Sequence, residues 1–201
     1  MIKRLFDAAL AAVCLLLSSP LWFLIPIAVK LEDGGPIFFP QERVGLAGRV
    51  FMALKFRSMQ PNAEALTGPV QATEHDPRVT RVGRLLRATA QDELPQLVNI
   101  LRGDMSFVGP RPLRPGEVDV RGDGRVTRLD EIPGYHERHG VRPGLTGLTQ
   151  VFAPRDISRA SKFRLDRLYI KRAGFWLDLR LILLSFWITA RGTWEVRGRK
   201  V

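Results

Sequence analysis

A long apolar run opens the chain, and a short polar stretch interrupts it in the middle. Leu5 to Val29 spans 25 residues and holds Asp7 as its only charge. A helix of that length reaches ~37 Å, enough to cross a hydrocarbon core of ~30 Å. Ser19 and Pro20 lie near its centre, and because proline removes a backbone hydrogen bond, we predict a bend there. The pattern therefore predicts a membrane-associated helix broken at Ser19-Pro20.

The residue pattern leaves open how this segment meets a membrane. Lys3 and Arg4 precede it and Lys30 follows it, so the positive-inside rule gives little preference for an orientation. A helix broken at its centre could enter and leave by the same face, and physical arguments favour the re-entrant and spanning arrangements about equally. A cleaved signal peptide is a third interpretation, which Asp7 and the lack of a clean small-residue cleavage site disfavour.

Alternation of apolar and polar residues predicts a small hairpin after this segment. Between residues 49 and 59, four apolar side chains share one parity, whereas Lys55 has the other. This period of two is typical of a strand, and residues 37–44 are a candidate partner strand. Residues 61–74 and 113–132 show no clear period and are expected to be surface loops.

A second apolar stretch runs from Phe163 to Trp194 and is interrupted by basic residues. Gly174 is expected to separate two helices within it. The uncharged run from Leu181 to Ala190 is too short to span a bilayer. Its flanking tryptophans fit an interfacial helix, and a buried core helix is an equally favoured interpretation.

Between these segments, four apolar residues with helical spacing predict a short helix near the middle of the chain, namely Leu94, Leu97, Val98 and Leu101. Asp92 suits its N-cap, Pro95 its first turn and Gly103 its C-terminal stop. The N–H groups of a helix N-terminus hold a carboxylate ionised and attract phosphate. Asp92 is therefore a candidate nucleophile or Mg²⁺ ligand with Glu93 beside it, although an ordinary capping pair is the simpler interpretation.

Arginines lie on both sides of this acidic pair. Residues 78–87 carry four arginines at three-residue spacing, the last being Arg87, and a helix would gather them on one basic face. Pro110 and Pro112 fix the backbone around Arg111, which lowers the entropic cost of a phosphate contact. The alternative for both sets is solvated surface arginine.

The composition and net charge favour anionic binding partners but do not identify which class of partner binds. The chain has 201 residues, a net charge of +11 and one cysteine, which suits one compact domain with an appended segment and excludes an intrachain disulfide. Such a charge favours anionic partners, such as nucleic acid, acidic lipid or phosphorylated substrates. Nucleic acid is not expected, because the aromatic residues cluster with apolar rather than basic ones. His136 and His139 alone do not complete a zinc site.

The ordered set of motifs resembles the bacterial sugar transferase family, the small monotopic polyprenol-phosphate phosphoglycosyl transferases. The resemblance covers nearly the whole chain. It rests on these segments, in this order: Gly35-Pro36-Ile37-Phe38-Phe39-Pro40-Gln41-Glu42-Arg43-Val44-Gly45, Leu54-Lys55-Phe56-Arg57-Ser58-Met59, Asp92-Glu93-Leu94-Pro95-Gln96, Gly103-Asp104-Met105-Ser106-Phe107-Val108-Gly109-Pro110-Arg111-Pro112, Val141-Arg142-Pro143-Gly144-Leu145-Thr146-Gly147 and Phe163-Arg164-Leu165-Asp166-Arg167-Leu168-Tyr169.

The resemblance implies a mostly helical α+β fold. Residues 1–31 would form a re-entrant membrane helix with both ends cytoplasmic, and residues 32–201 a catalytic domain with interfacial amphipathic helices and a small β-hairpin. The enzyme would lie in the bacterial inner (cytoplasmic) membrane, with its active site on the cytoplasmic face. It would move a sugar 1-phosphate from a nucleoside diphosphate sugar, with UDP the expected nucleotide, to a polyprenol phosphate such as undecaprenyl phosphate, and so initiate bacterial glycoconjugate synthesis.

The resemblance also assigns roles to residues. Asp92 would be the nucleophile that forms a phosphosugar-aspartate, with Glu93 the second acid of the dyad and both residues ligands of Mg²⁺. Lys55, Arg87 and Arg111 would bind substrate phosphates, and Ser19-Pro20 would be the helix break. The chain departs from the common pattern at residues 90–91 and 152–155, and the second departure leaves the identity of the sugar open.

Two other functions remain as alternatives at this point. A basic, membrane-bound adaptor without enzymatic activity would account for the charge. A nucleotide-sugar hydrolase would use the same acidic pair but transfer to water. Anionic membrane lipid is an expected partner of any of the three, and a homo-oligomer is left open.

Overall fold

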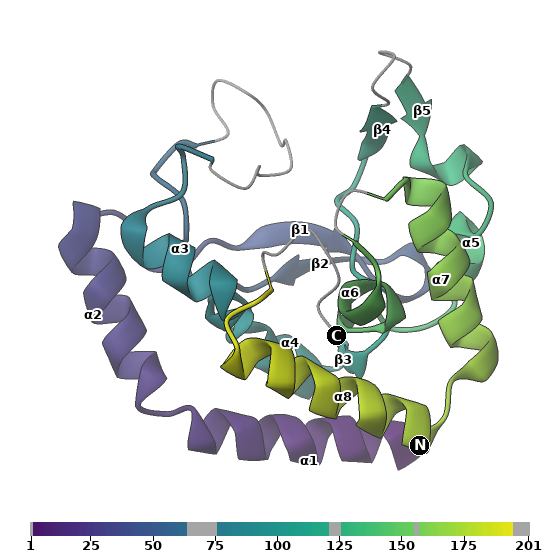
Figure 1. The fold of residues 1–201 in the computed structure, drawn as a ribbon, viewed down its shortest axis with the longest axis horizontal. Coiled ribbons are helices and arrows are strands. Elements are labelled where there is room, and N and C mark those ends of the chain that lie inside the picture. The colour runs from purple at the N-terminus through teal and green to yellow at the C-terminus, as the bar shows by residue number, and fades with distance from the viewer. Residues whose placement is uncertain (1, 64–75, 121–125, 155–156, 195–201) are drawn as a thin grey trace.

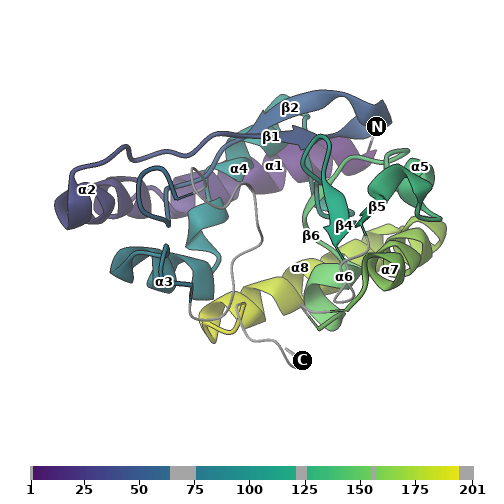
Figure 2. The ribbon, with the colours of Figure 1, turned by 90° about the horizontal axis from the view of Figure 1, so that it is seen from above.

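Helices dominate the fold, as predicted, and the described part of the chain also forms three small two-stranded sheets. The computed structural model describes residues 2–63, 76–120, 126–154 and 157–194 (Figure 1). Figure 2 shows the first hairpin along one side of the molecule and the last helix along the other, with helix α3 at one end. The α+β expectation is confirmed.

The apolar N-terminal run forms two helices, α1 (Ile2–Leu17) and α2 (Leu21–Asp33), which are bent by 63° at the predicted break. Ser18 partly compensates for the broken backbone ladder: its hydroxyl donates to the Leu15 carbonyl at 3.3 Å and accepts from the Trp22 indole N–H at 3.3 Å. Within the described chain, no single helix is long and apolar enough to cross a bilayer, whereas the bent pair together meets that requirement by length and composition.

Asp7, the lone charge in the apolar run, is buried and ties α1 to the middle of the chain. Its carboxylate accepts hydrogen bonds from the Ser106 hydroxyl at 2.8 Å and the Phe107 backbone N–H at 3.3 Å. Lys3 lies 3.7 Å from the same carboxylate. A buried carboxylate is stable only when it is paired in this way, so Asp7 fixes α1 against strand β3 (Ser106–Val108).

The predicted hairpin is present. Strand β1 (Gln41–Val44) pairs antiparallel with β2 (Val50–Ala53) across a 3₁₀ turn at Leu46–Gly48. Strand β2 ends before Lys55, so this lysine does not lie on a solvated strand face; its side chain is only 15% exposed. The core below contains β3 and its parallel partner β6 (Gly144–Thr146).

One predicted loop is partly wrong. Residues 113–132 contain a second antiparallel hairpin, β4 (Val118–Val120) with β5 (Val126–Arg128), and a 3₁₀ turn at Leu129–Glu131. The mixed composition of these short strands hides their period. Most of the other predicted loop, residues 61–74, lies outside the described residues.

The helix at the acidic pair begins later than predicted. Asp92 is not its N-cap but lies in a separate 3₁₀ turn (η2, Gln91–Glu93), and helix α4 runs over Gln96–Arg102 with Pro95 as N-cap residue. The predicted apolar stripe is also shifted, because Leu101 is exposed and Ile100 is fully buried. The left-handed Gly103 ends the helix as expected.

The remaining helices are α3 (Arg81–Ala88), α5 (Tyr135–Arg138), α6 (Leu148–Phe152), α7 (Arg159–Arg172) and α8 (Phe175–Ala190). Gly174 separates α7 from α8, as predicted. Helix α8 is in part a core helix, as one of the two interpretations predicted: Leu181 and Ile188 are fully buried, whereas Trp176 and Trp187 are more than half exposed.

Candidate active site

Asp92 lies in a short turn that the rest of the fold holds tightly. The turn follows Ala90, whose φ of 53° is left-handed, and the Asp92 carbonyl accepts from the Phe56 backbone N–H at 2.9 Å. The residue is 9% exposed. Among the residues that the structure describes, no donor hydrogen-bonds its carboxylate. A mostly buried carboxylate is costly unless water or a ligand contacts it, and Asp92 does not cap its turn, since the N-cap residue is Ala90.

Glu93 is engaged by two cations that meet at its Oε1, and Arg111 Nη1 also donates to its Oε2 at 3.5 Å. The Lys55 ammonium lies 2.7 Å from Oε1, and the Arg111 guanidinium lies 2.6 Å from the same atom. Lys55 and Glu93 are mostly buried, whereas the Arg111 side chain is half exposed. The structure therefore brings together four of the predicted site residues, because Asp92 is adjacent to Glu93.

The pKa values of Asp92 and Glu93 are shifted in opposite directions. Burial, reinforced by the negative charge of Glu93, raises the pKa of Asp92 to about 6. Burial also acts to raise the pKa of Glu93, but Arg111 and Lys55 outweigh it and hold that pKa well below its usual range. At neutral pH both are ionised, and only Asp92 has carboxylate oxygens free of hydrogen bonds.

Arg87 completes the predicted cationic set from another element. It lies in the last turn of α3, and its charge moderates the rise in the pKa of Asp92. The predicted basic face is only partly formed, because Arg78 precedes α3 and binds the Asp76 carboxylate at 2.7 Å. Ser19 and Pro20 are not part of this cluster and lie at the bend between α1 and α2.

Every carbonyl of the Pro110-Arg111-Pro112 segment is held by a donor from elsewhere in the chain. The Pro110 carbonyl accepts from Gly144 N–H at 2.9 Å. Arg138 Nη2 donates to the Arg111 carbonyl at 2.6 Å, and Arg43 Nη1 donates to the Pro112 carbonyl at 3.0 Å. The rigidity predicted from the two prolines is thus reinforced by contacts that sequence spacing cannot indicate.

Sequence reasoning missed Arg43 and Gln96 at this site. Both line a narrow crevice with the predicted residues, the full set being Arg43, Ala53, Lys55, Glu93, Gln96, Arg111 and Pro112. Burial, together with the charges of Arg111 and Arg114, lowers the pKa of Arg43 to about 10, so its guanidinium stays charged at neutral pH. The signal was available, because Arg43 and Gln96 each stand inside a quoted motif.

The acidic pair fits a cation held jointly with a substrate, and not a preformed cage. In the described part of the chain, no three His, Cys, Asp or Glu side chains converge as metal ligands. Mg²⁺ commonly uses one or two carboxylates and completes its shell with water and substrate phosphate. The Asp92 carboxylate, free of hydrogen bonds, suits this role, whereas Glu93 already neutralises Lys55 and Arg111.

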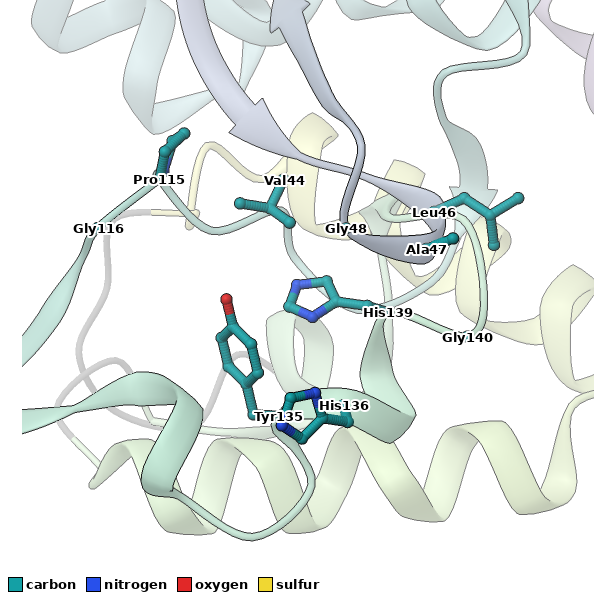
Figure 3. Close-up of a pocket in the computed structure, with 10 residues that line it drawn as sticks. All are labelled: Val44, Leu46, Ala47, Gly48, Pro115, Gly116, Tyr135, His136, His139 and Gly140. Carbon is teal, nitrogen blue, oxygen red and sulfur yellow. The ribbon is translucent and has the colours of Figure 1, made fainter.

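A larger cavity lies elsewhere, between the end of the first hairpin and α5 (Figure 3). It measures about 590 Å³ and is lined by none of the predicted site residues. Tyr135 and His139 face it, and none of the residues that the structure describes hydrogen-bonds the buried Nε2 of His139. We place the candidate active site at the narrow crevice because Arg43, Lys55, Glu93 and Arg111 converge there and Asp92 is the residue next to Glu93.

A family model described as "Bacterial sugar transferase" matches residues 1–192. The chain belongs to the bacterial sugar transferase family. The matched residues include the bent helix pair, the turn at Gln91–Glu93 (the acidic turn) and the Pro110-Arg111-Pro112 segment (the prolyl loop). The family resemblance read from the motifs is confirmed.

Curated members of the family are similar over most of this chain. A UDP-glucose:undecaprenyl-phosphate glucose-1-phosphate transferase of Caulobacter vibrioides is 43% identical over 188 residues, which cover 90% of this chain and 67% of that protein. An undecaprenyl-phosphate glucose phosphotransferase of Komagataeibacter xylinus is 41% identical over 91% of this chain and 35% of its own length. A UDP-N-acetylgalactosamine-undecaprenyl-phosphate N-acetylgalactosaminephosphotransferase of Aeromonas hydrophila is 43% identical over 90% of this chain and 42% of its own length. The chain therefore spans between about a third and two thirds of these relatives.

Proposed function

We propose that this chain transfers a sugar 1-phosphate from a UDP-sugar to undecaprenyl phosphate through a covalent intermediate on Asp92. The observation that carries the proposal is the contrast within the acidic turn, where the unengaged Asp92 carboxylate lies beside a Glu93 fixed by Lys55 and Arg111. The relatives are named for two different sugars, so the proposal covers UDP-sugars as a class and leaves the sugar to a donor panel.

The chemistry divides into two displacements at phosphorus. An Asp92 oxygen attacks the sugar-linked β-phosphorus, the bond from that phosphorus to the bridging oxygen breaks, and UMP leaves with its electron pair. A phosphate oxygen of the polyprenol then attacks the same phosphorus, and the Asp92 carboxylate leaves unchanged. Lys55, Arg43 and Arg111 lie where they would stabilise the equatorial phosphate charge in both displacements.

Mg²⁺ is part of the proposal, with Asp92 and a free lone pair of Glu93 as its protein ligands. Bound to the donor, the cation would neutralise diphosphate charge and assist the departure of UMP. What the chain's own residues supply is a fixed array of cations. Asp92 at a pKa of about 6 is ionised at neutral pH and remains a stronger base than an ordinary aspartate.

The membrane arrangement belongs to the same proposal. Large apolar side chains on α1, α2 and α8 are exposed, among them Leu5, Leu16, Leu17, Phe23, Leu31, Trp176, Leu183 and Trp187. Exposed apolar surface of this extent is typical of a membrane contact. We propose that α1 and α2 form a re-entrant pair in the bacterial inner membrane, with residues 1–31 as the membrane segment, residues 32–201 as the catalytic domain, and the active site on the cytoplasmic face.

Intact-mass analysis tests the catalytic proposal. Wild-type protein quenched during turnover of UDP-glucose should carry one added hexose phosphate, whereas Asp92→Asn should carry none and should remain bound to membranes. Product analysis distinguishes transfer from hydrolysis, because only transfer yields a polyprenol diphosphate sugar. Release of free sugar phosphate with no lipid product, or full turnover without an adduct under any donor, would contradict the proposal.

Cysteine labelling tests the membrane arrangement separately. In a Cys14→Ser background, Ile2→Cys and Glu42→Cys mark the two sides of the bent pair, since both positions are exposed. The re-entrant pair predicts that an impermeant reagent labels both from the cytoplasmic side only. Pro20→Leu should straighten the bend and move Ile2→Cys to the opposite side. Labelling of Ile2→Cys from the periplasm without that change would show a spanning helix.

A further inference from the structure

Arg138 is a fully buried arginine that sequence patterns did not single out. It ends α5, is 3% exposed, and its Nε lies 3.1 Å from Asp166 Oδ2 on α7. The Thr149 hydroxyl donates to the other carboxylate oxygen at 2.8 Å, and the Phe163 ring lies 4.8 Å below the guanidinium carbon. An ion pair enclosed in this way has one geometry available to it.

This ion pair is a poor device for stability alone. Taking two charges out of water costs about as much as their attraction returns, and apolar replacements of buried pairs are often neutral. A second nitrogen of Arg138 reaches the Pro110-Arg111-Pro112 segment: Nη2 donates to the Arg111 carbonyl oxygen at 2.6 Å. Arg111 in turn contacts Glu93 at 2.6 Å. The contacts thus connect Asp166, Arg138 and Arg111 to the acidic turn.

We propose that the buried Arg138–Asp166 pair is a positioning device, which fixes the backbone of Arg111 so that its guanidinium is held over Glu93 and the phosphate crevice. The inference rests on the proposed function, in which Arg111 binds substrate phosphate. Arg138 itself does not line the crevice, so it acts through the loop. Arg111 is half exposed and has a long side chain, and fixing its backbone removes part of the entropy that a phosphate contact would otherwise cost.

The test replaces both charges together, because removal of one would leave the other buried and unpaired. In the double variant Arg138→Met with Asp166→Leu, the thermal midpoint should stay close to that of the wild type. Turnover of UDP-glucose with undecaprenyl phosphate should fall about tenfold, and most of the change should lie in KM for the UDP-sugar, because Arg111 contacts the donor phosphate in the proposed function.

The same two helices offer a matched control. Arg167 on α7 pairs with Glu137 on α5 at 3.3 Å, but both side chains are exposed. Arg167→Met should leave turnover and KM for the UDP-sugar within about twofold of the wild type, since exposed ion pairs contribute little. Arg138→Lys, which retains a charge and one donor, should recover part of the lost turnover.

A double-mutant cycle with Arg111→Ala decides the mechanism of the effect. If Arg138 acts through Arg111, the paired replacement should cost about tenfold in wild type and less than about threefold in Arg111→Ala. Equal losses in both backgrounds, or full activity of the folded double variant, would overturn the positioning role. Full activity of Arg111→Ala alone would instead contradict the phosphate-binding role in the proposed function, so the two failures are distinguishable.

Discussion

The two acids of the 3₁₀ turn, Asp92 and Glu93, are adjacent in sequence, but their carboxylates lie in opposite electrostatic environments. On one side, the Glu93 carboxylate is fixed by Lys55 and Arg111. On the other, the Asp92 carboxylate is equally buried but accepts no hydrogen bond from the described residues. Burial is therefore common to both, and the difference in their pKa shifts comes from the charges placed against each.

This difference suits the two carboxylates to different roles, a structural one for Glu93 and a reactive one for Asp92. A carboxylate that accepts two charge-assisted hydrogen bonds at one oxygen holds its neighbours in place, but its charge is largely neutralised. A carboxylate left without donors is destabilising in the folded state and reactive toward an electrophile. We infer that the ionised Asp92 carboxylate destabilises the folded state, and that Glu93 holds Lys55 and Arg111 in place beside Asp92.

Asp92→Asn should give the largest effect and should separate activity from stability. Transfer should fall by on the order of 10³-fold or more, because the amide is no nucleophile. Stability at pH 8 should rise by about 1–3 kcal/mol, since the raised pKa means that ionised Asp92 destabilises the folded state above pH 6. Thermal unfolding in detergent micelles measures this. A loss of stability would show that Asp92 has partners that the structure does not contain.

Glu93→Gln should change stability in the opposite direction. Lys55 would be left buried without a carboxylate, and breaking a buried pair costs about 3 kcal/mol. Transfer should fall by about 100-fold, because Lys55 and Arg111 lose the group that orients them. The same unfolding assay, run beside Asp92→Asn, gives the comparison directly. Two neighbouring amide substitutions with the same sign of stability change would refute the contrast between the two acids.

Local sequence signals predicted the elements but not their contacts. Ser19-Pro20 marked the bend and Gly174 the boundary between the last two helices, because proline and glycine act on the backbone at their own positions. The acidic turn shows the limit of this reasoning. Pro95 and the left-handed Ala90 place Asp92 in its own 3₁₀ turn, whereas spacing alone indicated an ordinary helix cap.

The supports of the site come from far along the chain, where sequence patterns carry little information. Arg43 and Arg138 reach the prolyl loop across sequence separations of 69 and 27 residues. Asp7 could be noticed as a charge in an apolar helix, but its partners at Ser106 and Phe107 are 99 and 100 residues away. Such contacts follow from tertiary packing. Arg43, Ser106 and Phe107 lie within the family motifs, whereas Asp7 and Arg138 do not.

The pH dependence sharpens the comparison by titrating one acid and not the other. Turnover should fall below pH 6, to about a tenth of its plateau at pH 5, as Asp92 with its pKa of about 6 becomes protonated. Glu93, whose pKa lies well below its usual range, stays ionised over this interval. The stability contributed by protonated Asp92 is present at low pH and is lost as the pH rises through about 4 to 6, so activity and stability should move in opposite directions. An acidic limb centred near pH 4 would indicate an ordinary aspartate.

Arg111→Ala should give the smallest stability change and thereby distinguish the two cations on Glu93. Its side chain is 50% exposed, whereas that of Lys55 is 15% exposed. An exposed partner contributes less than about 1 kcal/mol, so the unfolding midpoint should barely move. Turnover should still fall about tenfold, with most of the change in KM for the UDP-sugar, because a phosphate contact is lost. Lys55→Met is the matched variant: it leaves the buried Glu93 carboxylate with only its solvent-exposed partner, and it should lower both turnover and stability. Equal losses of stability in Arg111→Ala and Lys55→Met would contradict the idea that burial makes Lys55 the structural cation and leaves Arg111 to contact the substrate.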